Sequence, residues 1–164
     1  MTDEIQSVAV KGYAWIKDFP SQLLINFVKT YNLLERILQQ HYGQFGLSEA
    51  KFNALFLLYR AKGGLLLSEL GEQMLVTRAN ITGLVDRLEK EGLVERFSHP
   101  TDRRSIIAKI TRRGRKLIEA VIPTHMELNR KLLSCFNEEE KKLVVTLLEK
   151  FYQRLVQLEE KMQS

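Results

Sequence analysis

Apolar residues recur every three or four positions along long stretches at both ends of the chain. In residues 20–42 they stand at positions 23, 24, 27, 31, 34, 38 and 42, and in residues 138–162 at 143, 147, 151, 155, 158 and 162. This spacing is typical of amphipathic helices. A further long helix is predicted for residues 115–135, after Gly114. Both ends of the chain are therefore expected to be helical, with wide apolar faces.

The middle of the chain predicts shorter elements. Ser48 is a typical N-cap for a helix that a pair of glycines closes after residue 62. The run LLL at residues 65–67 predicts a very short strand. Ser68 and Thr77 then begin two more helices, the second of which ends at the next glycine. The order is helix, strand, helix, helix.

The stretch LVERFSHPTDRRSIIAKIT, residues 93–111, predicts a β-hairpin. Two apolar runs rich in β-branched and aromatic residues flank a polar turn that contains Pro and Asp. Asp102, Arg103 and Arg104 stand side by side at its tip. Because exposed ion pairs contribute little stability, we expect this tip to reach outward to a partner.

The architecture that follows is mainly α with a small β-wing. Two helices joined by a short turn and followed by a hairpin predict a winged helix-turn-helix lobe, residues 47–114. Residues 1–46 and 115–164 supply the flanking helices of the same single domain. Their apolar faces have little else in the chain to cover them, so we expect dimerisation helices and a two-fold homodimer.

Charge is concentrated on the hairpin and the turn after it. Residues 95–116 hold eight Lys or Arg and two acids, so their net charge is +6 within a chain of +5. Such a one-sign cluster on a protruding ribbon is the electrostatic footprint expected for binding a polyanion.

The helix that begins at Thr77 is formally neutral, but its two faces differ. Its apolar positions 81, 84, 85 and 88 predict the buried side. The outward residues near its start, Arg78, Asn80 and Thr82, are types that bind base edges or phosphates. We therefore expect the helix to supply sequence preference and the hairpin to supply affinity.

The run TRANITGLVDRLEKEGLVERFSHPTDRRSIIAKITRRG resembles the multiple-antibiotic-resistance regulator (MarR) family of bacterial winged-helix repressors. It carries D-R-L-E-x-x-G-L-V-x-R, then D-R-R-S, a strand and T-x-x-G, in that order. The resemblance implies a homodimeric transcriptional regulator on a pseudo-palindromic operator in double-stranded DNA. It also implies that Asp102 orients Arg104 in the minor groove. The residues expected to contact DNA are Thr77, Arg78, Asn80, Thr82, Arg87, Asp102, Arg103, Arg104, Arg112 and Arg113.

Many members of this family release DNA when a small aromatic anion binds between the dimer helices and the DNA-binding lobe. By that resemblance, the expected effector site comprises Trp15, Phe19, His41, Tyr42, Phe45, Phe52 and Arg96.

No catalytic residue, metal site or cofactor is predicted. His125 and Cys135 lie on one predicted helix, about 15 Å apart by helix rise, too far to hydrogen-bond. The other two histidines, His41 and His99, show no ligand spacing. The longest apolar run is too short to span a membrane, and residues 1–10 lack the apolar core of a signal peptide. With its lone cysteine the chain is expected to be cytoplasmic.

One alternative class stays open at this stage. A helical interaction module could use the same basic hairpin to bind an acidic protein or RNA, without any enzymatic activity. Preference for a duplex with inverted half-sites would distinguish the DNA-binding regulator from this module.

Overall fold

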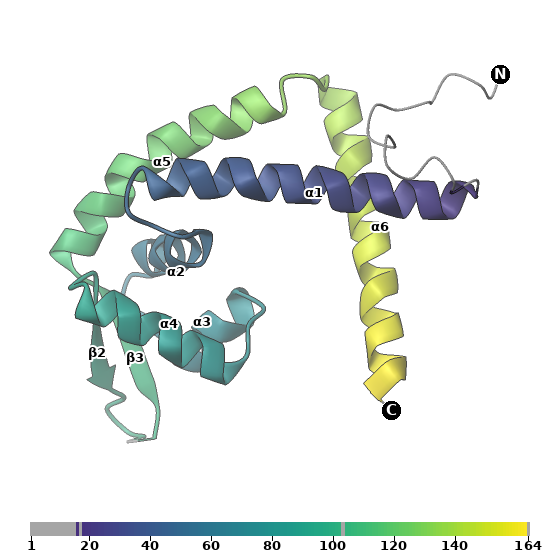
Figure 1. Cartoon of the computed structure of the whole chain (residues 1–164). Coiled ribbons are helices and arrows are strands. Elements are labelled where there is room, and N and C mark those ends of the chain that lie inside the picture. The colour runs from purple at the N-terminus through teal and green to yellow at the C-terminus, as the bar shows by residue number, and fades with distance from the viewer. Residues whose placement is uncertain (1–15, 17, 103, 164) are drawn as a thin grey trace. The chain divides into compact units, whose positions relative to one another are not determined.

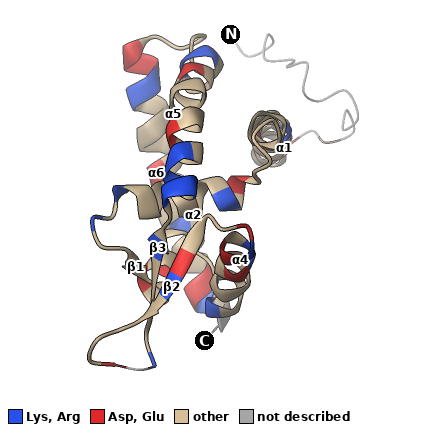
Figure 2. Ribbon diagram, turned by 90° about the vertical axis from the view of Figure 1, so that its left-hand side faces the viewer, with Lys and Arg blue, Asp and Glu red and all other residues tan. Residues whose placement is uncertain are grey.

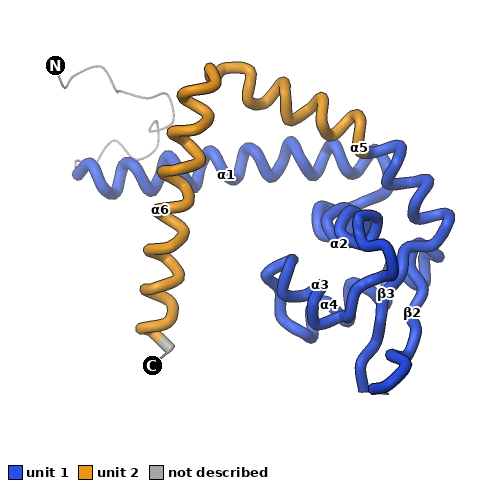
Figure 3. The backbone as a smooth tube through the Cα atoms, turned by 180° about the vertical axis from the view of Figure 1, so that it is seen from behind, with its two compact units in different colours: residues 1–121 blue, residues 122–164 orange. Residues whose placement is uncertain are grey.

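The structure is a computed structural model that describes residues 16, 18–102 and 104–163. It is mainly α-helical with a three-stranded antiparallel sheet, as predicted (Figure 1). The chain divides into two compact units, residues 1–121 and 122–164 (Figure 3). The helices are α1 (Phe19–Gly43), α2 (Glu49–Arg60), α3 (Leu67–Gln73), α4 (Arg78–Lys90), α5 (Arg112–Leu132) and α6 (Glu138–Gln163), and the strands are β1 (Leu65–Leu66), β2 (Val94–Ser98) and β3 (Ile106–Ile110).

The core of the first unit lies among α2, α3, α4 and the sheet. The strands are ordered β1-β3-β2, and β2 and β3 form the predicted hairpin. Leu55, Leu58, Leu70, Ile81 and Leu88 are fully buried, and each comes from a position where its helix turns its apolar side inward. This packing produces the winged helix-turn-helix arrangement.

Two of the predicted helix starts are confirmed by their caps. The Ser48 hydroxyl accepts a hydrogen bond from the Lys51 amide, and the Thr77 hydroxyl accepts one from the Asn80 amide, both at 3.3 Å. These bonds satisfy amides that the helix itself leaves without an acceptor.

The prediction that Ser68 begins a helix was wrong by one residue. Helix α3 starts at Leu67, because the Glu69 carboxylate accepts the Leu66 amide at 2.9 Å and so caps the helix from within.

Gly114 lies within α5 rather than before it, which corrects the predicted start at residue 115. The Thr111 hydroxyl accepts the Gly114 amide at 3.0 Å and caps the helix. A β-carbon at position 114 would lie 2.2 Å from the Leu93 carbonyl oxygen. Gly114 therefore allows α5 to approach the start of the hairpin closely, and it does not interrupt the helix.

The boundary between the two units falls inside α5, beside Pro123. Proline lacks the amide that would donate to the carbonyl four residues earlier, so the helix is locally weaker there. In the second unit, α6 begins with a reciprocal cap in which Asn137 and Glu140 exchange hydrogen bonds of 2.8 and 2.9 Å.

Large apolar side chains remain exposed on two long helices, one in each unit. On α1 they include Leu23, Leu24, Val28 and Tyr31, and on α6 they include Leu143, Leu147, Leu148, Tyr152 and Leu155. Contiguous apolar surface of this kind marks an interaction site.

Candidate nucleic-acid interface

Helix α4 has the two-sided character that its sequence predicts. Ile81, Leu84, Val85 and Leu88 are buried, with at most 5% of any of them exposed. The opposite side faces solvent. The packing of these four residues therefore determines which polar side chains of α4 are available to a partner.

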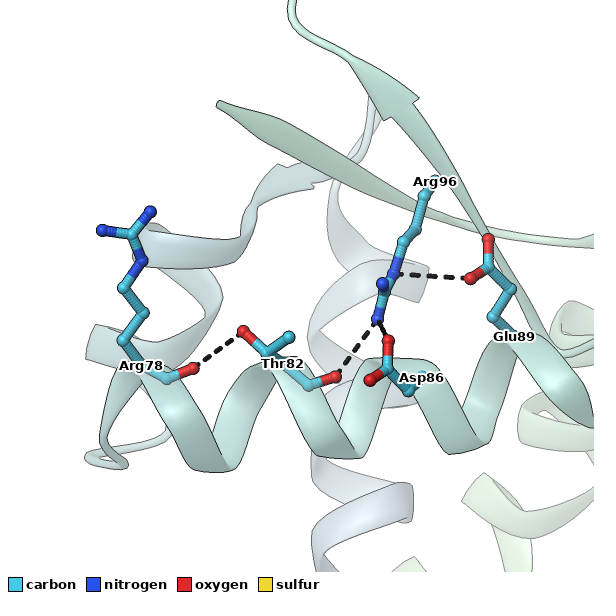
Figure 4. A network of polar contacts seen from close by, with 5 residues as sticks. All are labelled: Arg78, Thr82, Asp86, Glu89 and Arg96. Carbon is cyan, nitrogen blue, oxygen red and sulfur yellow. Dashed lines mark hydrogen bonds and ion pairs between the residues drawn. The ribbon is translucent and has the colours of Figure 1, made fainter. Parts of the chain in front are cut away.

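Three of the residues predicted to bind DNA lie exposed at the start of α4: Thr77, Arg78 and Asn80. Arg87 is also exposed, but it lies more than two helical turns further along α4. Thr82 is half-buried, and its hydroxyl donates to the Arg78 carbonyl at 2.8 Å (Figure 4). With its proton engaged in this way, the Thr82 side chain presents lone pairs and a methyl group to its surroundings.

Asp102 organises the turn at the wing tip. Its carboxylate accepts the Ser105 hydroxyl at 2.6 Å and the Arg104 amide at 3.0 Å. The Ser105 bond and then the Arg104 amide hold the pKa of Asp102 below its usual range. Asp102 thus positions Arg104 through the backbone, while the Arg104 side chain itself is exposed. Arg103 lies outside the described residues.

A groove of about 880 Å³ lies between α3, the start of α4 and the wing. Arg78, Arg96 and Arg104 line it, and Glu72 is the one acid among the lining residues that the structure describes. The groove therefore brings the predicted base-reading end of α4 and the wing arginine to one depression.

The basic residues beyond the wing tip divide into two sets. Arg112 and Arg113 are exposed in the first turn of α5. Lys109 lies over the Phe97 ring at 4.9 Å, and the Arg115 guanidinium lies over the Tyr59 ring at the same distance. Lys and Arg recur along the hairpin in Figure 2. The first set is available to phosphates, whereas the second is held against aromatic rings.

Arg96 lines this groove, but its guanidinium is already engaged by partners within the chain. Its guanidinium pairs with Asp86, donates to the Thr82 carbonyl at 3.1 Å and lies 3.5 Å from a Glu89 carboxylate oxygen (Figure 4). Only 24% of its side chain is exposed. Arg96 was predicted as an effector ligand, and its two acidic partners were missed. The spacing of Asp86 and Glu89, one turn apart, was the available signal.

Four of the predicted effector residues form an aromatic cluster where α1 meets α2. His41 makes edge contacts with Tyr42 and Phe45, and Tyr42 stacks on Phe52 at 4.6 Å. Burial raises the pKa of Tyr42 to about 12.

Two other predicted effector residues lie away from this cluster. Phe19 is at the far end of α1, about 33 Å from His41 by helix rise. Arg96 contacts α4 instead, and Trp15 lies outside the described residues. Within one chain, the described members of the set therefore do not form a single cleft.

Two negative findings concern only the described residues. They contain no group of three His, Cys, Asp or Glu side chains placed to hold a metal ion. None of the helices they form is both long enough and apolar enough to cross a membrane.

Comparison with known proteins gives a consistent result. The MarR family pattern matches residues 47–106. The transcriptional repressor YetL of Bacillus subtilis (strain 168) is 32% identical over 144 residues, covering 87% of this chain and 86% of that protein. The regulator PecS of Dickeya dadantii (strain 3937) is 32% identical over 142 residues, covering 85% of this chain and 86% of PecS.

Solved structures show the same fold. AbsC, a MarR family regulator from Streptomyces coelicolor, superposes with a TM-score of 0.80 at 22% identity, covering 86% of this chain and 97% of AbsC. The S. aureus MepR chain, solved in complex with DNA, has a TM-score of 0.75 at 22% identity, covering 85% of this chain and 99% of MepR.

Proposed function

The chain belongs to the MarR family, and from this premise we propose that it is a cytoplasmic, non-enzymatic repressor of transcription that binds double-stranded DNA. One observation carries the proposal. The exposed, polar start of α4 and the Asp102-ordered wing border the same groove, with Arg78 on one side and Arg104 on the other. This arrangement suits a helix in the major groove and a wing in the adjacent minor groove.

Helix α4 supplies the sequence preference in this proposal. Arg78 and Asn80 are exposed at its start, where arginine suits guanine and asparagine suits adenine. Thr82, whose proton is engaged by the Arg78 carbonyl, is left to accept from an amino group or to contact a thymine methyl. Thr77 and Arg87 lie at the edges of this surface and suit phosphates.

The wing and the start of α5 supply affinity. A narrow minor groove has an enhanced negative potential that favours an inserted guanidinium, which suits Arg104. Asp102 keeps the turn in shape. Arg103, which follows it in the sequence, adds a positive charge. Arg112 and Arg113 stand exposed in the first turn of α5, where they suit flanking phosphates.

We assign the functional unit as a homodimer. The exposed apolar residues of α1 and α6 need a partner, and a second copy is the simplest one. Two copies related by a two-fold axis present two α4 helices, so the operator is a pseudo-palindrome with half-sites about one helical turn apart.

The aromatic cluster at the junction of α1 and α2 supports an effector role. His41 and Phe45 are half-buried and can offer flat contacts to a ligand, whereas Tyr42 and Phe52 are buried within the same cluster. We propose that a small aromatic anion binds there and weakens DNA binding, through a higher affinity for the DNA-free state.

Selection from random-sequence DNA tests the proposed function. The wild-type protein should enrich duplexes that contain an inverted repeat and should bind them far more tightly than a scrambled duplex. If no sequence is enriched while an acidic protein or RNA is bound well, the hairpin serves an interaction module and the proposal is wrong.

A further inference from the structure

Arg96 fastens the outer strand of the wing to α4. Across the part of the chain that the structure describes, it is the one residue of β2 with side-chain hydrogen bonds or ion pairs to that helix. Its three partners are Thr82, Asp86 and Glu89, which stand four and then three positions apart and so share one face of α4 (Figure 4). A single planar guanidinium holds all three.

The environment makes this attachment more than a surface ion pair. The Arg96 side chain is 24% exposed, whereas its partners Asp86 and Glu89 are 45% and 43% exposed. Salt screens partly buried pairs less than exposed ones. A guanidinium that contacts two carboxylates and a carbonyl also has a defined orientation, which an ammonium with one point charge cannot reproduce.

Arg96 is the middle residue of β2, the outer strand of the wing. It pairs with Ala108 of β3, and the hairpin continues outward through the Ser98–Ile106 pair to the turn that carries Arg104. Strand β3 is held on its other side by β1, but β2 is the outer strand of the sheet. The direction of the wing relative to α4 therefore depends on what fastens β2.

We propose that Arg96 is a positioning residue for DNA reading, which holds the wing at a fixed separation from α4 so that both engage DNA together. The inference rests on the proposed function. When two binding elements are rigidly linked, binding of the first to DNA places the second beside its own site, so the second step is effectively intramolecular. A loose link between the two elements loses this gain in affinity. The benefit from Arg104 should therefore depend on Arg96, although Arg96 lies in the middle of β2 and Arg104 in the turn beyond the strand.

A double-mutant cycle tests this dependence. Arg96→Lys keeps the charge and removes the fork, so it separates positioning from simple electrostatics. On a duplex enriched from random DNA by the wild-type protein, Arg104→Ala should weaken binding about tenfold or more in the wild-type background. In the Arg96→Lys background the same change should cost less than about threefold. Equal reductions in affinity in both backgrounds would overturn the inference.

A second variant covers the case in which Arg96→Lys fails to fold. Asp86→Asn combined with Glu89→Gln removes the acidic partners and leaves Arg96 in place. If Arg96 only neutralised these acids, the double variant would bind every duplex more tightly. Adding Arg104→Ala to it would then lower the affinity as much as in the wild type, a result that contradicts the positioning role. The positioning role predicts that the cost of Arg104→Ala falls.

A matched control variant completes the design, and the wild-type background separates failure of the proposed function from failure of the positioning role. Arg130→Lys alters an exposed ion pair with Glu127, 3.0 Å long and outside the wing, and should leave the cost of Arg104→Ala unchanged. If Arg104→Ala has no effect even in the wild-type background, the proposed DNA-binding role of the wing itself is wrong. If it weakens the wild type and the Arg96→Lys variant equally, only the positioning role is wrong.

Discussion

Replacing Gly114 with alanine should destabilise the protein, although alanine is the better helix former. The new β-carbon would lie 2.2 Å from the Leu93 carbonyl oxygen and 2.9 Å from a side-chain carbon of Ile110. The same Leu93 carbonyl accepts the Thr111 amide at 3.0 Å. A shift that relieves the clash therefore strains the hydrogen bond that joins the wing to α5.

The magnitude follows from opposing contributions. Alanine in place of glycine favours a helix by at most about 1 kcal/mol. Overpacking against backbone costs about 1–3 kcal/mol, and a broken backbone hydrogen bond about 1 kcal/mol more. We therefore expect Gly114→Ala to lower the free energy of unfolding by about 1–3 kcal/mol.

Gly83→Ala is the matched control within α4. The nearest atom to its new β-carbon is the flexible end of Arg87 at 3.8 Å, an ordinary van der Waals distance. This variant should raise the free energy of unfolding by about 0.5–1 kcal/mol, because alanine is favoured inside a helix.

Both variants should be unfolded in urea at one fixed protein concentration, since assembly contributes to stability. The midpoint should fall for Gly114→Ala and rise for Gly83→Ala, with an unchanged slope. If Gly114→Ala stabilises the protein as much as Gly83→Ala, the close approach of α5 to Leu93 is wrong.

Three further predictions concern assembly, pH and the effector. Leu147→Asp places a charge on the exposed apolar side of α6 and should convert the proposed dimer into monomers, as measured by sedimentation. A wild-type protein that is already monomeric at micromolar concentration would contradict the proposed dimer. The pKa of Asp102 is lowered from 3.8, so its carboxylate hydrogen bonds are present above pH 3.8 and disappear as the pH falls through the lower folded-state pKa. The NMR resonance of the Arg104 amide should therefore shift with a midpoint below pH 3.8. A midpoint at or above pH 3.8 would refute these hydrogen bonds. Salicylate at millimolar concentration should weaken DNA binding, and Phe45→Ala should reduce that effect; unchanged affinity across a panel of aromatic acids would exclude this ligand class.

The sequence predicted those elements whose causes are local. The buried side of α4 follows from the spacing of Ile81, Leu84, Val85 and Leu88, and its start follows from the cap at Thr77. The hairpin follows from two β-branched runs around a polar turn. Each of these signals lies within a few residues of the feature that it determines.

The remaining features depend on packing between distant segments. Gly114 looks like the residue before a helix until the Leu93 carbonyl is placed against it. Arg96 resembles an available ligand until the packing of β2 against α4 brings it to Asp86 and Glu89. Phe19 and His41, both expected at the effector site, lie at opposite ends of α1 within one chain. Periodicity alone does not specify such tertiary neighbours.

The measurement that tests the central claim most directly is a set of binding titrations with the wild type, Arg78→Ala and Arg104→Ala. Each protein is titrated on the enriched duplex and on a scrambled duplex, at several salt concentrations. Arg104→Ala should weaken binding to both duplexes and reduce the slope of the salt dependence by about one unit for each arginine removed from the DNA. Arg78→Ala should cost about 1–3 kcal/mol on the enriched duplex and much less on the scrambled one. If Arg104→Ala leaves both the affinity and the salt dependence unchanged, the hairpin is not a DNA-binding wing and the proposed function is contradicted.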